Sequence, residues 1–305
     1  MTPKISRRRF VSRSAGALLL AGTLPIAAIE PFKRTGPPRI RSSLVAYSLR
    51  DSFKFNAGKV LTDPQKSLDL FQFVDYCATH GWSAAELTGY YFPPDVTDEY
   101  LQRLRRHCFL ANVEVSGTSV GNNFTLPEGE KRNEQIATTK KWIDRAAVLG
   151  APYLRVFAGT GREMTQPGLK QLCIAALQEC ADHAGTRGVM LGMENHGGID
   201  AAETLEILRA VRSPWFALNL DVGNFQTDDP YADLEKCAPY AINVHWKNEI
   251  KPRGKENEPA DFKRLAKILR DANYQGYAAL EYEAKPDPWK AVPELRTRMQ
   301  ETFGG

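Results

Sequence analysis

Residues 169–194 decide the fold, and they read LKQLCIAALQECADHAGTRGVMLGME. In the first part of this stretch, apolar side chains at helical spacing predict an amphipathic helix; they are Leu169, Leu172, Cys173, Ala176 and Cys180. Gly188 then supplies the left-handed cap that ends such a helix before a short loop. The apolar run Val189–Met193 predicts a buried strand, and Glu194 follows it directly. The stretch therefore predicts one helix–strand unit with a polar residue at the end of its strand.

The same unit recurs along the chain from residue 43 onward. Eight short apolar runs predict strands, namely Leu44–Leu49, Ala84–Leu87, Val113–Ser116, Tyr153–Phe157, Val189–Met193, Phe216–Leu220, Ile242–Val244 and Tyr277–Leu280. Strands that alternate with helices pair in parallel, and uniformly apolar strands indicate that both faces of the sheet are covered. Eight units over about 260 residues match a (β/α)8 TIM barrel, which usually spans about 250 residues. We therefore predict the α/β class and a single TIM-barrel domain over 43–305.

An open, doubly wound sheet is the alternative that this alternation of strands and helices also permits. Such sheets usually carry a glycine-rich phosphate turn after the first strand. Here the first predicted strand is followed by Arg50-Asp51-Ser52-Phe53-Lys54, which contains no glycine. The closed barrel is therefore the better prediction.

The N-terminal 28 residues predict an export signal. Ser6-Arg7-Arg8-Arg9-Phe10-Val11 is a twin-arginine pattern, and an apolar stretch follows it over 15–28. That stretch has the length of a signal-peptide core and is too short for a good transmembrane helix. We therefore expect a twin-arginine signal peptide over 1–28 and a linker over 29–42. The mature protein would be periplasmic or secreted, with no membrane partner once the signal is cleaved.

Charge and cysteine content exclude several classes of protein. The chain has 40 Lys and Arg against 36 Asp and Glu, and five of the basic residues lie in 1–28. The remainder, with 35 basic and 36 acidic residues, is close to neutral, so we expect no nucleic acid partner. The five cysteines are too scattered for a disulfide framework, and we expect buried free thiols. The oligomeric state stays open, with a homo-oligomer among the states allowed.

Four consecutive predicted strands end in residues that can bind a metal ion. The fifth to eighth strands are followed by Glu194, Asp221, His245 and Glu281, at spacings of 27, 24 and 36 residues. In a TIM barrel the chemistry lies at the carboxyl ends of the strands, so these side chains should meet at the barrel mouth. Three carboxylates that converge without a cation would repel one another. Oxygen and nitrogen ligands without a thiolate suit one divalent ion, of Mn, Mg, Co or Zn.

Four segments at these strand ends carry a resemblance to a known family. They are Glu194-Asn195-His196-Gly197-Gly198, Leu220-Asp221-Val222-Gly223-Asn224, Val244-His245-Trp246-Lys247, and Gly276-Tyr277 with Glu281-Tyr282-Glu283. As an ordered set, they resemble the sugar phosphate isomerase/epimerase family, which belongs to the xylose-isomerase-like TIM barrels. The resemblance covers roughly residues 43–285 and implies ketose or keto-sugar substrates.

The resemblance also implies roles for the four ligand-type residues. Glu194 and Glu281 would be the catalytic pair that moves a proton next to the sugar carbonyl, and they would also bind the metal. Asp221 and His245 would be metal ligands alone. Glu283 is a rival for Glu281 but lies beyond the apolar run of the last strand. Five further residues near strand ends are predicted to contact the substrate: His196, Lys247, Arg155, Glu86 and Asn123.

Two loops and the other histidines complete the prediction. Tyr90-Tyr91-Phe92 forms either a sugar-stacking wall or a plug at the barrel edge. The charged loop 248–259 is either a lid or specificity loop, or a plain surface loop. The remaining histidines lie in helical stretches and predict structural or surface roles; they are His80, His107 and His183.

We therefore predict a metal-dependent sugar isomerase or epimerase whose partner is a small-molecule carbohydrate. Two alternatives use the same scaffold. One is a lyase or dehydratase, for example one that performs β-elimination on a 3-keto-glycoside, and the other is a non-catalytic carbohydrate-binding barrel. A zinc-dependent apurinic endonuclease of the same superfamily would need more histidines at the barrel mouth than His196 and His245.

Overall fold

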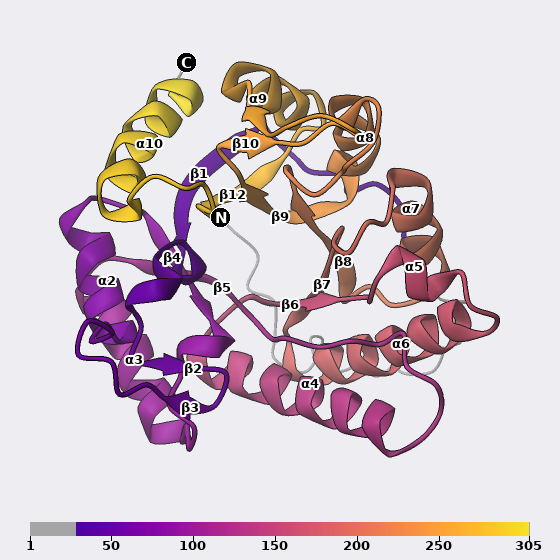
Figure 1. The fold of residues 1–305 in the computed structure, drawn as a ribbon, viewed down its shortest axis with the longest axis horizontal. Coiled ribbons are helices and arrows are strands. Elements are labelled where there is room, and N and C mark those ends of the chain that lie inside the picture. The colour runs from indigo at the N-terminus through magenta and orange to yellow at the C-terminus, as the bar shows by residue number, and fades with distance from the viewer. Residues whose placement is uncertain (1–28, 305) are drawn as a thin grey trace, which may run out of the picture.

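The computed structural model describes residues 29–304. They form a closed barrel of eight parallel strands with helices around it (Figure 1). The order around the barrel is β1-β12-β9-β8-β7-β6-β5-β4. These strands are β1 Arg39–Val45, β4 Ala84–Thr88, β5 Glu114–Ser119, β6 Tyr153–Phe157, β7 Met190–Glu194, β8 Phe216–Asp221, β9 Ala241–Trp246 and β12 Gln275–Leu280. The predicted (β/α)8 TIM barrel is confirmed.

Helices form the outer ring, as Figure 1 shows. They are α2 Leu70–Thr79, α3 Asp98–Leu110, α4 Glu130–Leu149, α5 Gly161–Met164, α6 Leu169–Arg187, α7 Ala201–Ala210, α8 Pro230–Cys237, α9 Phe262–Asp271 and α10 Pro288–Phe303, with 3-10 turns η1 Ala46–Ser52, η2 Gly89–Tyr91 and η3 Ala238–Tyr240. The unit over 169–194 folds as its pattern predicts. Cys173, Ala176 and Cys180 of α6 are buried, and the helix ends at Gly188, whose φ of 68° is left-handed.

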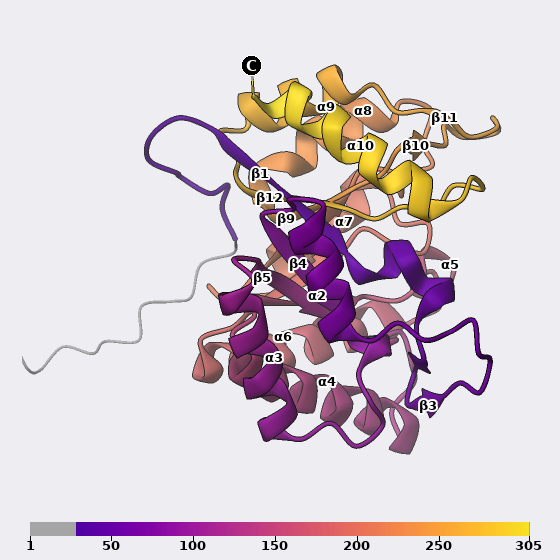
Figure 2. The same ribbon diagram turned by 90° about the vertical axis from the view of Figure 1, so that its left-hand side faces the viewer.

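Two small hairpins stand on the loops at the carboxyl end of the barrel. β2 Phe55–Asn56 pairs with β3 Lys59–Val60, and β10 Glu249–Ile250 pairs with β11 Glu258–Pro259. Figure 2 shows both hairpins on one side of the molecule, opposite the segment that leads into β1. These insertions therefore border the mouth at which a TIM barrel carries its chemistry.

The first strand lies earlier in the chain than predicted. We predicted Leu44–Leu49, but β1 spans Arg39–Val45, and the next residues form η1. The register with β12 runs from Arg39 opposite Gln275 to Leu44 opposite Leu280. The predicted linker over 29–42 therefore ends inside the barrel. The apolar pattern failed here because the first residues of β1 are partly exposed, which permits the polar sequence Arg-Ile-Arg-Ser.

Hydrogen-bonded polar side chains fill part of the barrel interior. The hydroxyls of Ser43 and Ser116 lie 2.7 Å apart, and Asn243 Nδ2 donates to Asn219 Oδ1 at 2.7 Å. All four side chains are buried. Because buried polar groups cost free energy unless they are hydrogen bonded, these contacts hold β1 against β5 across the barrel and β8 beside β9 in one arrangement.

The predicted signal peptide lies outside the described residues. Within 29–304, no helix is both long enough and apolar enough to cross a membrane. The five cysteines all lie in this range, and each is buried and free, as predicted. His107 and His183 pair with Asp75 and Asp144 on helix surfaces, which agrees with their predicted structural role.

Candidate metal centre and the cavity beside it

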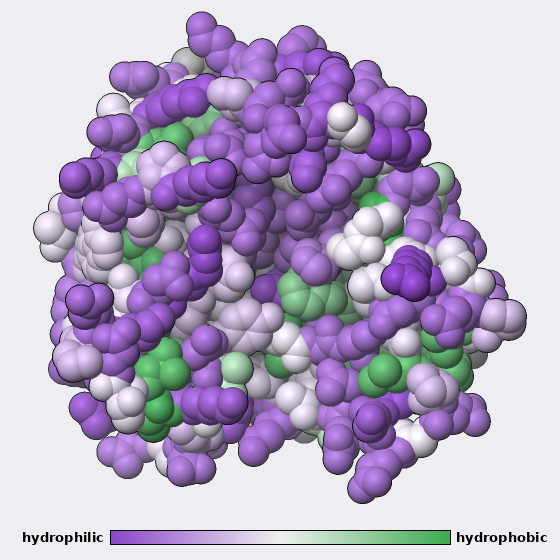
Figure 3. Space-filling model, in the orientation of Figure 1, coloured by the Kyte–Doolittle hydropathy of each residue, from purple (hydrophilic) through white to green (hydrophobic). Residues whose placement is uncertain are grey.

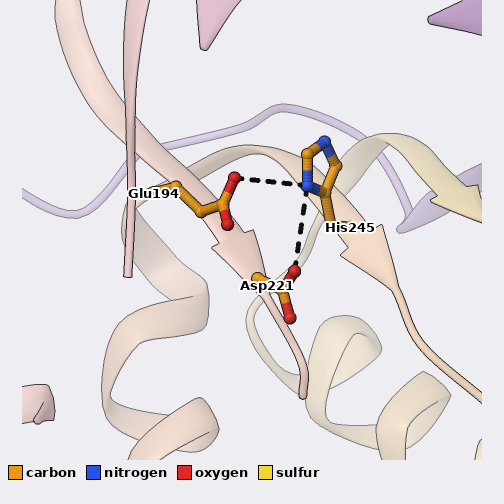
Figure 4. Close-up of side chains that lie close together, drawn as sticks. All are labelled: Glu194, Asp221 and His245. Atoms are coloured by element: carbon orange, nitrogen blue, oxygen red, sulfur yellow. Dashed lines mark ion pairs between the residues drawn. The ribbon is translucent and has the colours of Figure 1, made fainter. Parts of the chain in front are cut away.

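Three side chains from neighbouring strands meet at the barrel mouth. Glu194 ends β7, Asp221 ends β8, and His245 lies opposite Asp221 in the register of β8 with β9. Each is buried and offers one ligand atom, and these atoms lie within 4.8 Å of one another. Figure 4 shows both carboxylates directed at the same imidazole nitrogen, with His245 Nδ1 3.4 Å from Glu194 Oε2 and 3.9 Å from Asp221 Oδ2.

Glu281 joins this group from β12. It follows the last residue of the strand, and its Oε2 lies 3.5 Å from His245 Nδ1. The same oxygen accepts from Lys247 Nζ at 2.6 Å. Glu283 is 46% exposed and forms an ion pair with Lys247 farther out. Of the two rival carboxylates, Glu281 is therefore the one that faces His245.

Two orphaned atoms make this group fit a divalent cation. Asp221 Oδ2 and His245 Nδ1 are both buried and make no hydrogen bond within residues 29–304. Each has only longer ion-pair contacts, the shortest at 3.4 Å, with Lys247 Nζ and Glu194 Oε2 respectively. Leaving a buried polar atom unpaired costs about 1–3 kcal/mol. A cation would satisfy both atoms, and the oxygen and nitrogen donors of Glu194, Asp221, His245 and Glu281 suit a hard or borderline divalent ion.

Glu86, which we predicted to contact the substrate, lies beneath His245 and does not line the cavity described below. Its side chain is fully buried, and its two oxygens lie 3.0 and 3.1 Å from His245 Nε2. Tyr153 donates its hydroxyl to the same carboxylate, and Asn243 Nδ2 approaches at 3.4 Å. Since a carboxylate accepts, His245 Nε2 must donate, which leaves Nδ1 free to act as the ligand.

Asn123, also predicted to contact the substrate, is turned toward the start of α5. Its Nδ2 donates to Glu163 Oε1 at 3.2 Å, and its Oδ1 accepts from the backbone N–H of Thr125 at 2.8 Å. Glu163 in turn completes the capping box at the start of α5 with Thr160. Asn123 therefore stabilises the loop around α5. The loop after β5 turns the side chain toward this cap, which spacing along the chain does not encode.

Basic side chains set the charge of the carboxylates. Burial would raise the pKa of Glu194, but the Arg155 guanidinium, 3.1 Å away, and His245 hold it at about 2. Burial likewise opposes ionisation of Glu281, yet Lys247 and His245 keep its pKa below the usual value. For Asp221, the effect of burial exceeds the opposite effect of the Lys247 ammonium, and the pKa rises to about 7. Asp221 is therefore the carboxylate least compensated by basic groups.

Lys247 and His245 are held as cations by the same acids. Burial lowers the pKa of Lys247, but Asp221, Glu281 and Glu283 outweigh it and raise the pKa well above its ordinary value. For His245, Glu86 and Glu281 likewise overcome burial and raise the pKa. In the cationic ring Nδ1 carries a proton. A metal bound at Nδ1 would displace this proton, since metal ligands bind deprotonated.

A cavity of about 330 Å³ opens directly above these groups. Figure 3 looks into the barrel mouth and shows a central hollow with mostly hydrophilic residues around it. Three residues predicted to contact the substrate line this cavity: Arg155, His196 and Lys247. Tyr90 lines it as well, whereas Tyr91 and Phe92 are buried. The aromatic run after β4 therefore serves as both wall and plug.

Three lining residues were not among the predicted site residues. Tyr47 lies in η1 and packs edge-on against Tyr90, with ring centroids 6.4 Å apart. Phe157, at the end of β6, lies under the Arg155 guanidinium and against the His196 ring, whose centroid is 4.4 Å away. Asn224 donates to Glu194 Oε1 at 3.0 Å. Their positions were the available signal, because Phe157 ends β6 and the other two residues closely follow β1 and β8. Tyr47 was missed because the first strand was predicted to extend over it.

Comparisons with known proteins agree with this fold. An L-ribulose 3-epimerase shares 15% identity over 87% of this chain and 95% of its own, with a TM-score of 0.69. A 3-keto-D-glucoside 4-epimerase from E. coli shares 15% identity over 87% and 99%, with a TM-score of 0.64. The probable 3-DHS dehydratase of Bacillus anthracis shares 15% over 87% and 99%, with a TM-score of 0.62.

At these identities, the three structures show the fold alone. No curated protein matches the chain in sequence. The family model described as "Xylose isomerase-like TIM barrel" matches residues 74–300, which is most of the chain. The chain therefore belongs to the xylose isomerase-like TIM barrel family.

Proposed function

We propose that this protein is a metal-dependent epimerase or isomerase that moves the proton on the carbon next to the carbonyl of a keto-sugar. The observation that carries the proposal is the pair of orphaned atoms, Asp221 Oδ2 and His245 Nδ1, set between the carboxylates of Glu194 and Glu281 at the floor of an open polar cavity. Structural similarity to two sugar epimerases adds weight to this class of reaction.

Glu194 and Glu281 are the groups suited to proton transfer. Both have pKa values below the ordinary range, so both begin as carboxylates and can accept a proton. Either one would take the α-proton and could return it to the same or the neighbouring carbon. Inversion at one carbon requires the other carboxyl to deliver a proton from the opposite side, after gaining one from water or a substrate hydroxyl.

A divalent ion held by Glu194, Asp221, His245 and Glu281 would polarise the carbonyl as a Lewis acid and stabilise the enediolate charge. The protein's own cations act beside it. Lys247 presents a buried ammonium next to Glu281, where it can donate a hydrogen bond to a substrate oxygen. Arg155 fixes Glu194 through the ion pair at 3.1 Å. Tyr47 and Phe157 supply apolar faces for the ring carbons.

A lyase or dehydratase is the second candidate, and Lys247 is the observation that favours it. Its ammonium lies at 2.6 Å from Glu281 and faces the cavity, so it could protonate a leaving oxygen after Glu281 removes the α-proton. The similarity to a probable dehydratase adds support. The two reactions differ in their products, because elimination gives an unsaturated keto-sugar and a released fragment, whereas isomerisation conserves mass.

The test is solvent deuterium incorporation into a panel of keto-sugars by the Mn²⁺-loaded protein, followed by mass spectrometry. Glu194→Gln and Glu281→Gln should each reduce exchange by about 10²–10⁴-fold, the contribution of general acid–base catalysis. Glu235→Gln, on the exposed face of α8, is the matched control and should exchange normally. A protein that binds metal and sugar but exchanges no proton would be a carbohydrate-binding barrel instead.

We also propose that the protein works outside the cytoplasm after twin-arginine export. The support is the arginine-rich pattern over 6–11 with the apolar stretch that follows it. A protein exported after folding would carry its metal with it.

A further inference from the structure

A second cavity adjoins the one above the metal centre. We call it the side cavity, and it measures about 150 Å³. It lies between the loop after β8, the β10–β11 hairpin and the loop after β12. Asn224, Lys247 and Glu283 line both cavities. A molecule that occupies the first cavity can therefore extend into the second without leaving the protein surface.

The lining of the side cavity is mostly polar, and its charged side chains are Lys247, Glu249, Lys251 and Glu283. Carboxamide side chains come from both of its walls: Asn224, Gln226, Asn248 and Asn257. A carboxamide offers two donors and an acceptor, so it can pair with a hydroxyl in either sense. Several of them around one hollow suit a sugar ring, which carries a hydroxyl on nearly every carbon. An apolar group would find few partners here.

The loop over 248–259, which forms one wall of the side cavity, is held in place by hydrogen bonds and packing. Arg253 N–H donates to Thr227 O at 2.9 Å and ties the hairpin tip to the loop after β8. Ala260 N–H donates to Asn248 O at 3.0 Å and closes the base of the hairpin. Ile250 is 2% exposed and anchors β10 to the core. The loop over 248–259 is therefore a structured wall.

Gly223, which lines the side cavity, cannot be replaced by a larger residue without a shift of its neighbours. A Cβ at Gly223 would lie 2.8 Å from Lys247 Cγ and 3.2 Å from Glu249 O. A side chain there would press on Lys247 and on the hairpin backbone, both of which line the side cavity. Glycine thus lets the hairpin lie close to Lys247.

We propose that the side cavity is a second sugar subsite, so that the substrate is a glycoside, a keto-sugar unit joined to another sugar, rather than a free monosaccharide. This inference rests on the proposed function. The reacting unit lies above Glu194 and Glu281, and the second ring lies over Gly223 against Gln226 and the hairpin.

The experiment compares matched probes that differ only by the second ring. Solvent deuterium incorporation is followed for 3-keto-D-glucose against 3-ketotrehalose, and for D-fructose against isomaltulose, with the Mn²⁺-loaded protein. We expect kcat/KM to be at least about tenfold higher for one disaccharide than for its monosaccharide, as two or more hydrogen bonds would give. Gln226→Trp, which fills the side cavity, should abolish that preference, and Gln226→Ala should reduce it.

Gln102→Trp, on the exposed face of α3, is the control and should keep the preference. Each Gln226 variant should lower kcat/KM for the disaccharide by a larger factor than for the monosaccharide. Equal kcat/KM for both members of each pair would overturn the subsite while leaving the proposed function intact. So would a loss in Gln226→Trp that affects both members equally. No exchange with any probe, although metal is bound, would instead overturn the proposed function and this inference together.

Discussion

His245 Nε2 lies 3.0 Å from Glu86 Oε1, and neither side chain has any exposed surface. This pair connects the barrel interior to the candidate metal centre, because the bond to Glu86 decides which imidazole nitrogen faces Asp221. Outer carboxylates of this kind orient a metal-binding histidine and raise its basicity. The two residues come from β4 and β9, which are not neighbours in the barrel.

Removing the charge of Glu86 should weaken metal binding without touching a ligand. Glu86→Gln is expected to lower metal affinity by about 10- to 100-fold, the usual effect of losing such a partner. Titration calorimetry with Mn²⁺ measures it. Glu114→Gln, at the opposite end of the barrel, is the control. Unchanged affinity in Glu86→Gln would mean that His245 is not a ligand or is oriented by other contacts.

Lys247 should contribute more to the stability of the metal-free protein than to that of the metal-bound protein. Its ammonium neutralises Asp221 and Glu281, so Lys247→Met leaves buried carboxylates unpaired and should cost about 3–5 kcal/mol in the free energy of unfolding. Urea unfolding in EDTA would show the loss, and added Mn²⁺ should recover much of it, because the cation takes over the neutralising role. Equal stability of the variant and the wild type in EDTA would refute this account.

The cysteines should resist alkylation until the protein unfolds. Burial raises the pKa of Cys108, Cys173, Cys180 and Cys237 to about 12 each, so almost no thiolate forms near neutral pH. Since the unfolded thiols ionise near pH 8.5, stability should be complete below that pH and fall as pH rises toward 12. Iodoacetamide labelling at pH 8, with and without urea, checks this. Fast labelling of the native protein would contradict it.

Export should depend on the arginines at the N-terminus. Replacing Arg7, Arg8 and Arg9 together by lysine keeps the charge but removes the twin-arginine pattern. We expect the protein to remain in the cytoplasm after this change and to reach the periplasm without it. Cell fractionation with an antibody against the barrel distinguishes the two. Normal export of the lysine variant would point to a different route.

Periodicity was sufficient to predict the barrel, because most strands are buried and read as apolar runs. β1 and β5 were exceptions, since each begins with exposed or partly exposed residues and has a largely polar sequence. At the site, Asp221 and His245 were predictable because strand ends fix their level in the barrel. Glu86 was not, since its burial under His245 depends on a contact across 159 residues of sequence. The same holds for Asn123, whose direction is set by the cap of α5.

The most direct test of the central claim is metal content, measured by plasma mass spectrometry on the purified protein beside Asp221→Ala and His245→Ala. We predict about one divalent ion per wild-type chain, as a single site with four protein ligands would hold, and a loss of that ion in both variants. A folded wild-type protein that takes up no metal even after reconstitution, or variants that keep it, would contradict the account.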